Sequence, residues 1–325
     1  MISSYAQPLL EGCGTIKKGD LRVLAKTKPV PFVTLFASQA FDRDELARLR
    51  TALSAVAVEP RVLEALESLV GFLPIEDSDA KKKSEELNDS SSWPGWLGPR
   101  RDGHVSSLPA TLAMLPEVVW EVSLAHAGLG GIAATKQFVV FGDRDLDDFH
   151  DVFRCLDAET GKPRWTVKRL AIASLDYGNT PRATPLIDGD RVYCLGALGN
   201  LLCVRLGDGQ VLWERVFRDE FPLDEPLPWG YCGSPLLVDG MLVIAPGSAD
   251  ASLMALDPVT GETLWKTPGA GPSYGSLTAG RLGGRKQIVG HDAETIGGWD
   301  VASGRRLWTI RPESPGDFNV PTPLI

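Results

Sequence analysis

The stretch Cys155-Leu-Asp-Ala-Glu-Thr-Gly-Lys-Pro-Arg-Trp165 decides the fold, because its pattern returns three more times along the chain. In each copy a glycine stands four residues before a tryptophan. The pairs are Gly161 and Trp165, Gly209 and Trp213, Gly261 and Trp265, and Gly304 and Trp308. Together with Trp120, these indoles recur at intervals of roughly 43 to 52 residues, which is the length of a propeller blade. The repeat therefore predicts successive four-stranded sheets arranged around an axis.

The residues between each aspartate and tryptophan predict a tight hairpin turn. Three copies place an aspartate eight residues before the tryptophan, at Asp157, Asp257 and Asp300. The carboxylate accepts amides of the turn, a Thr or Ser hydroxyl adds a local bond, and the glycine supplies a positive φ. The copy from Arg205 to Gly209 departs from this pattern, and for it we expect a different turn.

A second repeated element opens each unit. It is found as Thr184-Pro-Leu-Ile-Asp-Gly189, as Ser234-Pro-Leu-Leu-Val-Asp-Gly240, in degenerate form at Ser276, and as Thr322-Pro-Leu-Ile325. The last copy stops a few residues into a new blade. We therefore expect a mostly β chain with an incomplete propeller of about four or five blades over residues 93–325.

Residues 1–77 have a different pattern, that of a partial α/β segment. Two apolar runs, 21–25 and 32–36, are typical of buried strands, and two helical stretches follow. The first helix is capped by Asp42 or Asp44 and aligns Leu46, Leu49, Leu53 and Val56 on one face. Residues 78–92 are rich in Asp, Lys, Glu and Ser, so we expect a flexible linker there.

Charge and composition exclude several classes of protein. The formal net charge is −9, and no stretch interleaves basic with aromatic residues, so we expect no nucleic-acid partner. From the pattern of this sequence we expect neither a transmembrane segment nor a signal peptide. Its five cysteines are odd in number and lack CxxC spacing. Whether Cys194 and Cys203 are bonded stays open.

The repeat resembles the pyrroloquinoline-quinone-like β-propeller repeat. The segment from Trp93 to Gly103, WPGWLGPRRDG, is similar to the entry segment of a large bacterial group of such propellers, many of them exported. That group is related in fold to the outer-membrane protein assembly factor propeller. The resemblance implies eight blades and an exported or periplasmic location, and it gives the repeated tryptophans the role of docking adjacent blades.

The N-terminal segment is similar to the C-terminal part of phosphate or phosphonate periplasmic binding proteins. The similarity rests on Ile2-Ser-Ser-Tyr5, on Leu21 to Thr27 and on Gly71-Phe-Leu-Pro74. In that family an Asp-Ser-Tyr stretch helps to hold the anion. Here Ser4 and Tyr5 match, whereas Ser3 replaces the usual aspartate, and we expect the first lobe of such a domain to be absent. We expect a vestigial domain without a competent anion site.

Three functional hypotheses remain. The favoured one is a non-catalytic binding or scaffolding module that holds protein partners on the propeller faces, without cofactor or metal. A quinoprotein dehydrogenase with pyrroloquinoline quinone (PQQ) and Ca²⁺ is the first alternative, but that family uses adjacent cysteines and this chain has none. An anion sensor with the propeller as relay is the second.

Four other features carry weaker expectations. The acidic run Asp143 to Asp148 lacks the pattern of a Ca²⁺ loop, so it is interpreted as a solvated loop rather than a cation site. Gly271-Pro-Ser-Tyr-Gly275 matches a nucleophile elbow, but a strand follows instead of a helix. Cys155 and Cys203 share the repeat position ten before the tryptophan, where a small buried residue is expected. The four histidines are scattered without ligand spacing.

Overall fold

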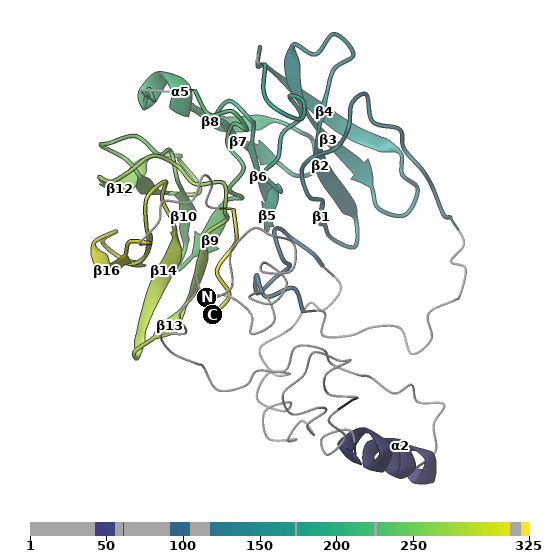
Figure 1. Cartoon of the computed structure of the whole chain (residues 1–325). Helices are drawn as coiled ribbons and strands as arrows, with labels where there is room; N and C mark the ends of the chain where they lie inside the picture. Colours follow the sequence, from purple (N-terminus) through teal and green to yellow (C-terminus); the bar gives the residue numbers. More distant parts are fainter. Residues whose placement is uncertain are drawn as a thin grey trace. The chain divides into compact units, whose positions relative to one another are not determined.

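Figure 1 shows a computed structural model of the chain, which describes residues 43–55, 61, 92–104, 118–172, 174–223, 226–312 and 320–325. Contacts divide the chain into two units, Met1–Asn88 with Ser106–Pro116 and Asp89–Val105 with Glu117–Ile325. In the first unit, helix α2 (Arg43–Ala55) has Asp44 and Glu45 in its first turn, where they interact favourably with the helix dipole. This is the first of the two predicted helices. Ser4, Tyr5, the second predicted helix and residues 78–91 lie outside the described residues.

The second unit contains four antiparallel sheets of four strands, each in simple sequence order. Blade 1 comprises β1 (Ala133–Ala134), β2 (Phe138–Arg144), β3 (His150–Asp157) and β4 (Pro163–Leu170). Blade 2 comprises β5 (Leu186–Asp188), β6 (Arg191–Leu195), β7 (Asn200–Arg205) and β8 (Val211–Val216), followed by the short helix α5 (Phe217–Glu220). Blade 3 comprises β9 (Leu236–Val238), β10 (Met241–Ile244), β11 (Leu253–Leu256) and β12 (Thr263–Thr267). Blade 4 comprises β13 (Thr278–Leu282), β14 (Arg285–His291), β15 (Ile296–Asp300) and β16 (Arg306–Ile310). The predicted incomplete propeller is confirmed.

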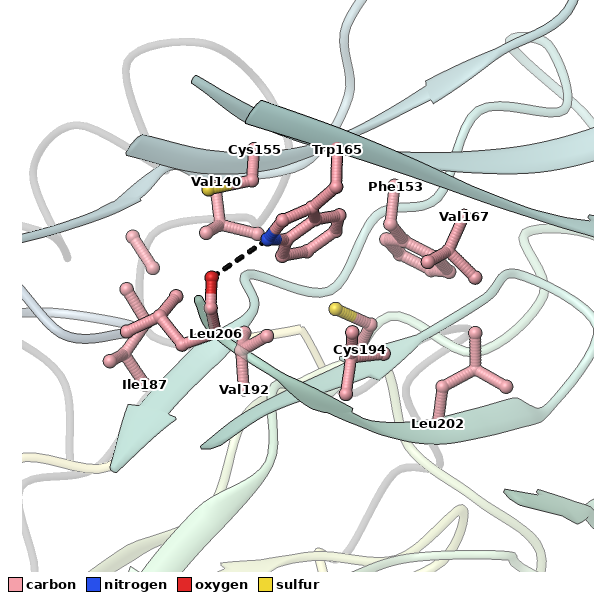
Figure 2. Close-up of a cluster of buried hydrophobic side chains, with 12 residues drawn as sticks. Val140, Phe153, Cys155, Trp165, Val167, Ile187, Val192, Cys194, Leu202 and Leu206 are labelled. Carbon is pink, nitrogen blue, oxygen red and sulfur yellow. Dashed lines mark hydrogen bonds between the residues drawn. The ribbon is translucent and has the colours of Figure 1, made fainter. Parts of the chain in front are cut away.

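The core is divided into three layers, one between each pair of successive blades. The first joins blades 1 and 2, the second blades 2 and 3, and the third blades 3 and 4. Side chains alternate along a strand, so each central strand contributes to the layers on both of its sides. Figure 2 shows the first layer, in which Phe153 and Trp165 from blade 1 lie opposite Val192 and Leu202 from blade 2.

The same alternation settles the cysteine question. Cys194 lies in the layer between blades 1 and 2, whereas Cys203 lies in the layer between blades 2 and 3. Across the hairpin, Cys194 is paired with Leu202 and Cys203 with Tyr193. The two thiols are free because they point to opposite faces of one sheet.

In each blade, the residue ten positions before the tryptophan lies on the third strand and is paired with the tryptophan on the fourth strand. Cys155 faces Trp165 and Cys203 faces Trp213, and a bulge follows each of the two cysteines. In the other two blades Ala255 faces Trp265 and Gly298 faces Trp308. Small residues occupy this position because the indole lies beside it, which agrees with the packing role expected for the two cysteines.

The opening residues of the repeat form a chain of hydrogen bonds that joins the blades. The Thr184 amide donates to the Ser234 hydroxyl at 2.9 Å, and the Ser234 amide donates to the Ser276 hydroxyl at 3.0 Å. The Ser276 amide donates to the Thr322 hydroxyl at 3.3 Å. We call these four residues the hydroxyl chain. It explains the hydroxyl side chains of Ser234, Ser276 and Thr322, each of which accepts the amide of the preceding member.

Among the described helices, none is long and apolar enough to cross a membrane.

Candidate functional site

Four of the five repeated indoles donate a hydrogen bond to the next blade along the chain. The acceptor lies in the turn between the third and fourth strands of that blade. The indole N–H of Trp165 donates to the Leu206 carbonyl at 2.7 Å, as Figure 2 shows, and that of Trp120 donates to Ala158 at 3.0 Å. Trp213 donates to Pro258 and Trp265 to Val301, both at 3.1 Å. Each acceptor directly follows the first residue of the turn.

The glycine of each turn lies against the same indole. A Cβ at Gly209 would stand 2.7 Å from Trp165 carbons, and one at Gly161 or Gly261 would be equally close to the preceding indole. Gly304 makes the same approach to Trp265. The φ angles of these four glycines lie between +66° and +78°. The repeat therefore needs glycine both for a left-handed conformation and for space.

Trp308 differs from the other four. Its indole N–H donates to the Gln287 side chain of its own sheet at 2.7 Å. A Cβ at Gly298, on the adjacent strand, would clash with the indole ring. Among the described residues, Trp308 is thus packed within blade 4 rather than against a following turn.

Aspartate organises three of the four turns. Asp157 Oδ1 accepts from the Thr160 amide at 2.9 Å and from the Thr160 hydroxyl at 2.8 Å. Asp257 accepts the Thr260 amide, and Asp300 accepts both groups of Ser303. These bonds hold the pKa of Asp157 low, at about 2, with the Thr160 hydroxyl making the largest contribution.

The divergent second turn keeps the backbone of the others. The Gly209 amide donates to the Arg205 carbonyl at 2.9 Å, as Gly161 does to Asp157. The cap is reversed, because Asp208 accepts from the Gln210 amide at 3.0 Å and pairs with the Arg205 guanidinium. Our expectation of a different turn was wrong for the backbone and right for the side chains.

The opposite end of the blades forms the candidate site. In every blade, the loop between the second and third strands lies at this end, because successive strands alternate in direction. The connection from the fourth strand to the next blade lies at the same end. We call this end the loop face. It includes the acidic run from Asp143 to Asp148, the connection 171–185, and the connections that follow β8 and β12.

The acidic run is anchored by a buried arginine, not solvated as expected. Arg144 is fully buried, and its guanidinium donates to Asp148 Oδ1 at 2.8 Å and to Asp151 Oδ1 at 2.9 Å. It also donates to the Ala171 carbonyl at 2.9 Å, which ties the β2–β3 loop to the next connection. Asp143, also fully buried, pairs with Arg154 at 2.8 Å. Only Leu146 and Asp147 of the run are exposed.

Asp151 is the strained member of this network. Its second carboxylate oxygen is buried without a hydrogen-bond partner and lies against Gly196 of blade 2, where a Cβ would clash. Desolvation raises the pKa of Asp151 to about 6 in spite of Arg144.

Two of the histidines, predicted to be scattered, meet at Asp145. His150 Nδ1 lies 2.6 Å from Asp145 Oδ2, and His126 Nε2 lies 2.9 Å from the Asp145 carbonyl. Desolvation is the largest single influence on Asp145 and acts to raise its pKa, but the hydrogen bonds from the His150 amide and ring and from the Phe149 amide together outweigh it and lower the pKa to about 2. Within the described residues no three His, Cys, Asp or Glu side chains form a group that could hold a metal ion.

Large apolar side chains are exposed at the tip of blade 1. Leu146 and Phe149 are 85% and 51% exposed, and Leu170 and Ile172 are each 62% exposed. The two pairs lie on adjacent segments, because the Ala171 amide donates to the Phe149 carbonyl at 2.8 Å. We call these four residues the blade 1 tip. The buried Arg144 network holds both segments in place.

Three aromatic rings from consecutive connections form a row on the same face. Tyr177 packs edge to face on Trp229 with centroids 6.1 Å apart, and Trp229 lies 4.7 Å from Tyr274. We call these three residues the aromatic row. Beside it, a cavity of about 20 Å³ is lined by Cys232, Ser234, Ser273 and others, which is room for about one water molecule.

The candidate nucleophiles, which are Ser273 and Cys232 beside this cavity and Cys155 and Cys203 in the core layers, are poorly activated. Ser273, in the elbow-like pattern, donates its hydroxyl to the His291 carbonyl at 3.1 Å, and the segment leads into strand β13. Burial raises the pKa of the Cys232 thiol to about 11 and that of Cys155 and Cys203 to about 12. These thiols stay protonated at neutral pH.

The entry segment, residues 93–103, connects several blades at their inner strands. Trp93 pairs with Ala134 of blade 1, and the Pro94 carbonyl accepts the Ile187 amide of blade 2 at 2.7 Å. Arg101 is buried and donates to the Pro235 carbonyl of blade 3 at 2.7 Å. The Trp96 indole donates to the Thr322 hydroxyl at 3.1 Å. The sequence identified this segment only by resemblance and gave no sign of these contacts.

Comparison with protein families gives two matches. A family model described as outer membrane protein assembly factor BamB matches residues 116–224 and 224–319. A model described as ABC transporter, phosphonate, periplasmic substrate-binding protein matches residues 5–80. Both resemblances expected from the sequence are confirmed. No curated protein matches the chain.

Solved structures similar to this chain include a BamB protein and two dehydrogenases. BamB from Moraxella catarrhalis is 23% identical over 61% of this chain and 57% of its own, with a TM-score of 0.45. A europium-containing methanol dehydrogenase is 10% identical over 72% of this chain and 51% of its own, with a TM-score of 0.48. The quinohemoprotein alcohol dehydrogenase ADHIIG from Pseudomonas putida HK5 is 13% identical over 75% of this chain and 43% of its own, with a TM-score of 0.49. The chain thus spans about half the length of these proteins.

Proposed function

Because this chain belongs to the family of the outer membrane protein assembly factor BamB, we propose that its propeller is a non-catalytic module that binds protein partners on the loop face. The proposal places the protein in the bacterial periplasm or outside the cell, in keeping with both matching families. It assigns no chemical step to any residue of the chain.

The blade 1 tip is the observation that carries this proposal. Leu146, Phe149, Leu170 and Ile172 expose apolar area on two segments that a buried ion network fixes in position. Burying an arginine with its carboxylates costs free energy, so such a network supports specific geometry better than it supports stability. A preorganised apolar patch loses little conformational entropy on binding and is typical of protein interfaces.

Site-specific crosslinking tests the proposal. A photoreactive amino acid at Leu146, on the loop face, is compared with one at Gln137, an exposed turn residue at the other end of blade 1. We expect a discrete adduct from position 146 in the producing cell's periplasm, and its loss on Phe149→Asp. Equal crosslinking from both positions, or an adduct unaffected by Phe149→Asp, would overturn the assignment of the face.

A cofactor-binding experiment on the purified protein distinguishes the binding function from the enzyme alternative. Incubation with PQQ and Ca²⁺, followed by desalting, is expected to leave no retained quinone absorbance and no alcohol-dependent dye reduction. Retained cofactor at one equivalent with dye reduction would replace the binding function by a quinoprotein dehydrogenase.

The N-terminal segment supplies a second candidate function, which its family match favours. Residues 5–80 match a phosphonate-binding family, and Ser4 and Tyr5 stand at or beside the start of that match. Calorimetry of the whole chain with phosphate and methylphosphonate tests an anion sensor. We expect no heat for either ligand; saturable heat that Tyr5→Phe weakens would establish the sensor instead.

A further inference from the structure

The aromatic row is assembled from three connections that are separate in sequence. Tyr177 precedes blade 2, Trp229 precedes blade 3 and Tyr274 precedes blade 4. Tyr177 is 78% exposed, while Trp229 and Tyr274 are each half-buried. The row therefore offers a continuous, partly exposed aromatic surface that crosses the boundaries between blades.

Hydrogen bonds to backbone carbonyls fix the connection that carries Tyr177. Tyr177 has a φ of +66°, an uncommon value for a residue with a side chain. The Asp176 amide donates to the Pro228 carbonyl at 2.8 Å, which ties this connection to the one that carries Trp229. Arg182 donates to the Asp176 and Gly178 carbonyls at 2.6 Å and 2.7 Å. Tyr177 is thus held beside Trp229 before any ligand binds.

An exposed carboxylate stands next to the row, and two more are exposed elsewhere on the loop face. Asp176 is exposed, and its charge acts on Tyr274. Asp147 and Asp250 are also exposed on the loop face, and within the described part of the chain none of these three carboxylates forms an ion pair closer than 4.0 Å. Arg182 is the nearby cation, and its guanidinium is turned to backbone carbonyls.

We propose that the aromatic row binds an extended, arginine-rich segment of a partner protein, with a guanidinium over Trp229 and a charge pair to Asp176. A cation over a tryptophan face is attracted by the negative ring face, and arginine adds planar stacking. The cavity beside the row is too small for a side chain, so the segment lies on the surface. This inference rests on the proposed binding function and gives it a partner chemistry.

Peptide binding tests the inference on the whole chain. Fluorescein-labelled (Gly-Arg)5, (Gly-Gln)5 and (Gly-Glu)5 are titrated with the protein and followed by anisotropy. Only the arginine peptide is expected to bind. Tyr177→Ser, which removes an exposed ring, and Trp229→Ala are each expected to weaken binding at least tenfold, with folding checked by circular dichroism.

Two matched substitutions distinguish binding at the aromatic row from a general attraction of the peptide to the protein's net negative charge. Asp176→Asn is expected to weaken the arginine peptide several-fold, whereas Asp188→Asn, an exposed aspartate at the other end of blade 2, is expected to change it little. Equal effects of the two variants, or equal binding of all three peptides, would overturn the inference. Because crosslinking at Leu146 does not involve the row, an adduct there without peptide binding would reject this inference alone.

Discussion

Glycine in the repeated turn meets two demands that can be separated by mutation. Gly209 has a φ of +78° and lies against Trp165, whereas Gly240 has a φ of +72° with nothing near its missing Cβ. Gly240→Ala is expected to cost about 1 to 2 kcal/mol, the penalty of a left-handed residue. Gly209→Ala is expected to cost more by about 1 to 3 kcal/mol, because the methyl group displaces the indole. Urea denaturation of both variants measures the difference, and equal costs would show that the indole adds nothing.

Asp151 gives the protein a distinctive dependence of stability on pH. Burial raises its pKa in the folded protein to about 6, above that of an exposed aspartate, so folding takes up a proton between these values. Its contribution therefore favours the folded state below about pH 4 and is lost as pH rises through 6. Asp145 and Asp157, with lowered pKa values of about 2, act in the opposite direction as pH falls. We expect Asp151→Asn to make stability rise more steeply between pH 4 and 6; an unchanged slope by urea denaturation at several pH values would contradict the assignment.

Hydroxyl groups at the blade openings are the element-scale link between sheets. Ser234 is buried, and its hydroxyl accepts the Thr184 amide, so Ser234→Ala leaves a buried donor unsatisfied at a cost of about 1 to 3 kcal/mol. Thr184 is the matched control, because its own hydroxyl is buried without a partner. Thr184→Val removes an unpaired polar group and is expected to be neutral or stabilising. Thermal unfolding of the two variants measures both changes in stability. Similar destabilisation by both would contradict the role of the hydroxyl chain in linking the sheets.

At the scale of elements, the sequence predicts the repeated features of the fold well. The spacing of Trp165, Trp213, Trp265 and Trp308 predicted the sheets, since each blade repeats one local pattern of turn and strand. The loop face was poorly predicted, because its contacts join residues that do not repeat. Nothing in the single sequence indicated that Arg144 would be buried, and its acidic neighbours are typical of a solvated loop.

The same distinction applies to the whole molecule. The aromatic row depends on three blades being placed side by side, so no local pattern around Tyr177, Trp229 or Tyr274 identifies it. The entry segment likewise touches blades 1, 2 and 3 through single contacts, such as the one from Arg101 to Pro235. These contacts are visible only after the repeats have been arranged in space.

Packing between neighbours predicts that stability varies along the row of blades. In repeat architectures each unit is stabilised mainly by the units next to it. Blades 2 and 3 have core layers on both sides, whereas blade 4 has its described layer only against blade 3 and keeps Trp308 on its own sheet. Amide hydrogen exchange is therefore expected to be slower in β6 and β10 than in β14. Trp265→Ala, which removes the indole bonded to Val301, is expected to speed exchange in blade 4 at least tenfold and to leave blade 1 nearly unchanged. An equal increase in all four sheets would show one cooperative unit and would rule out stabilisation by neighbours alone.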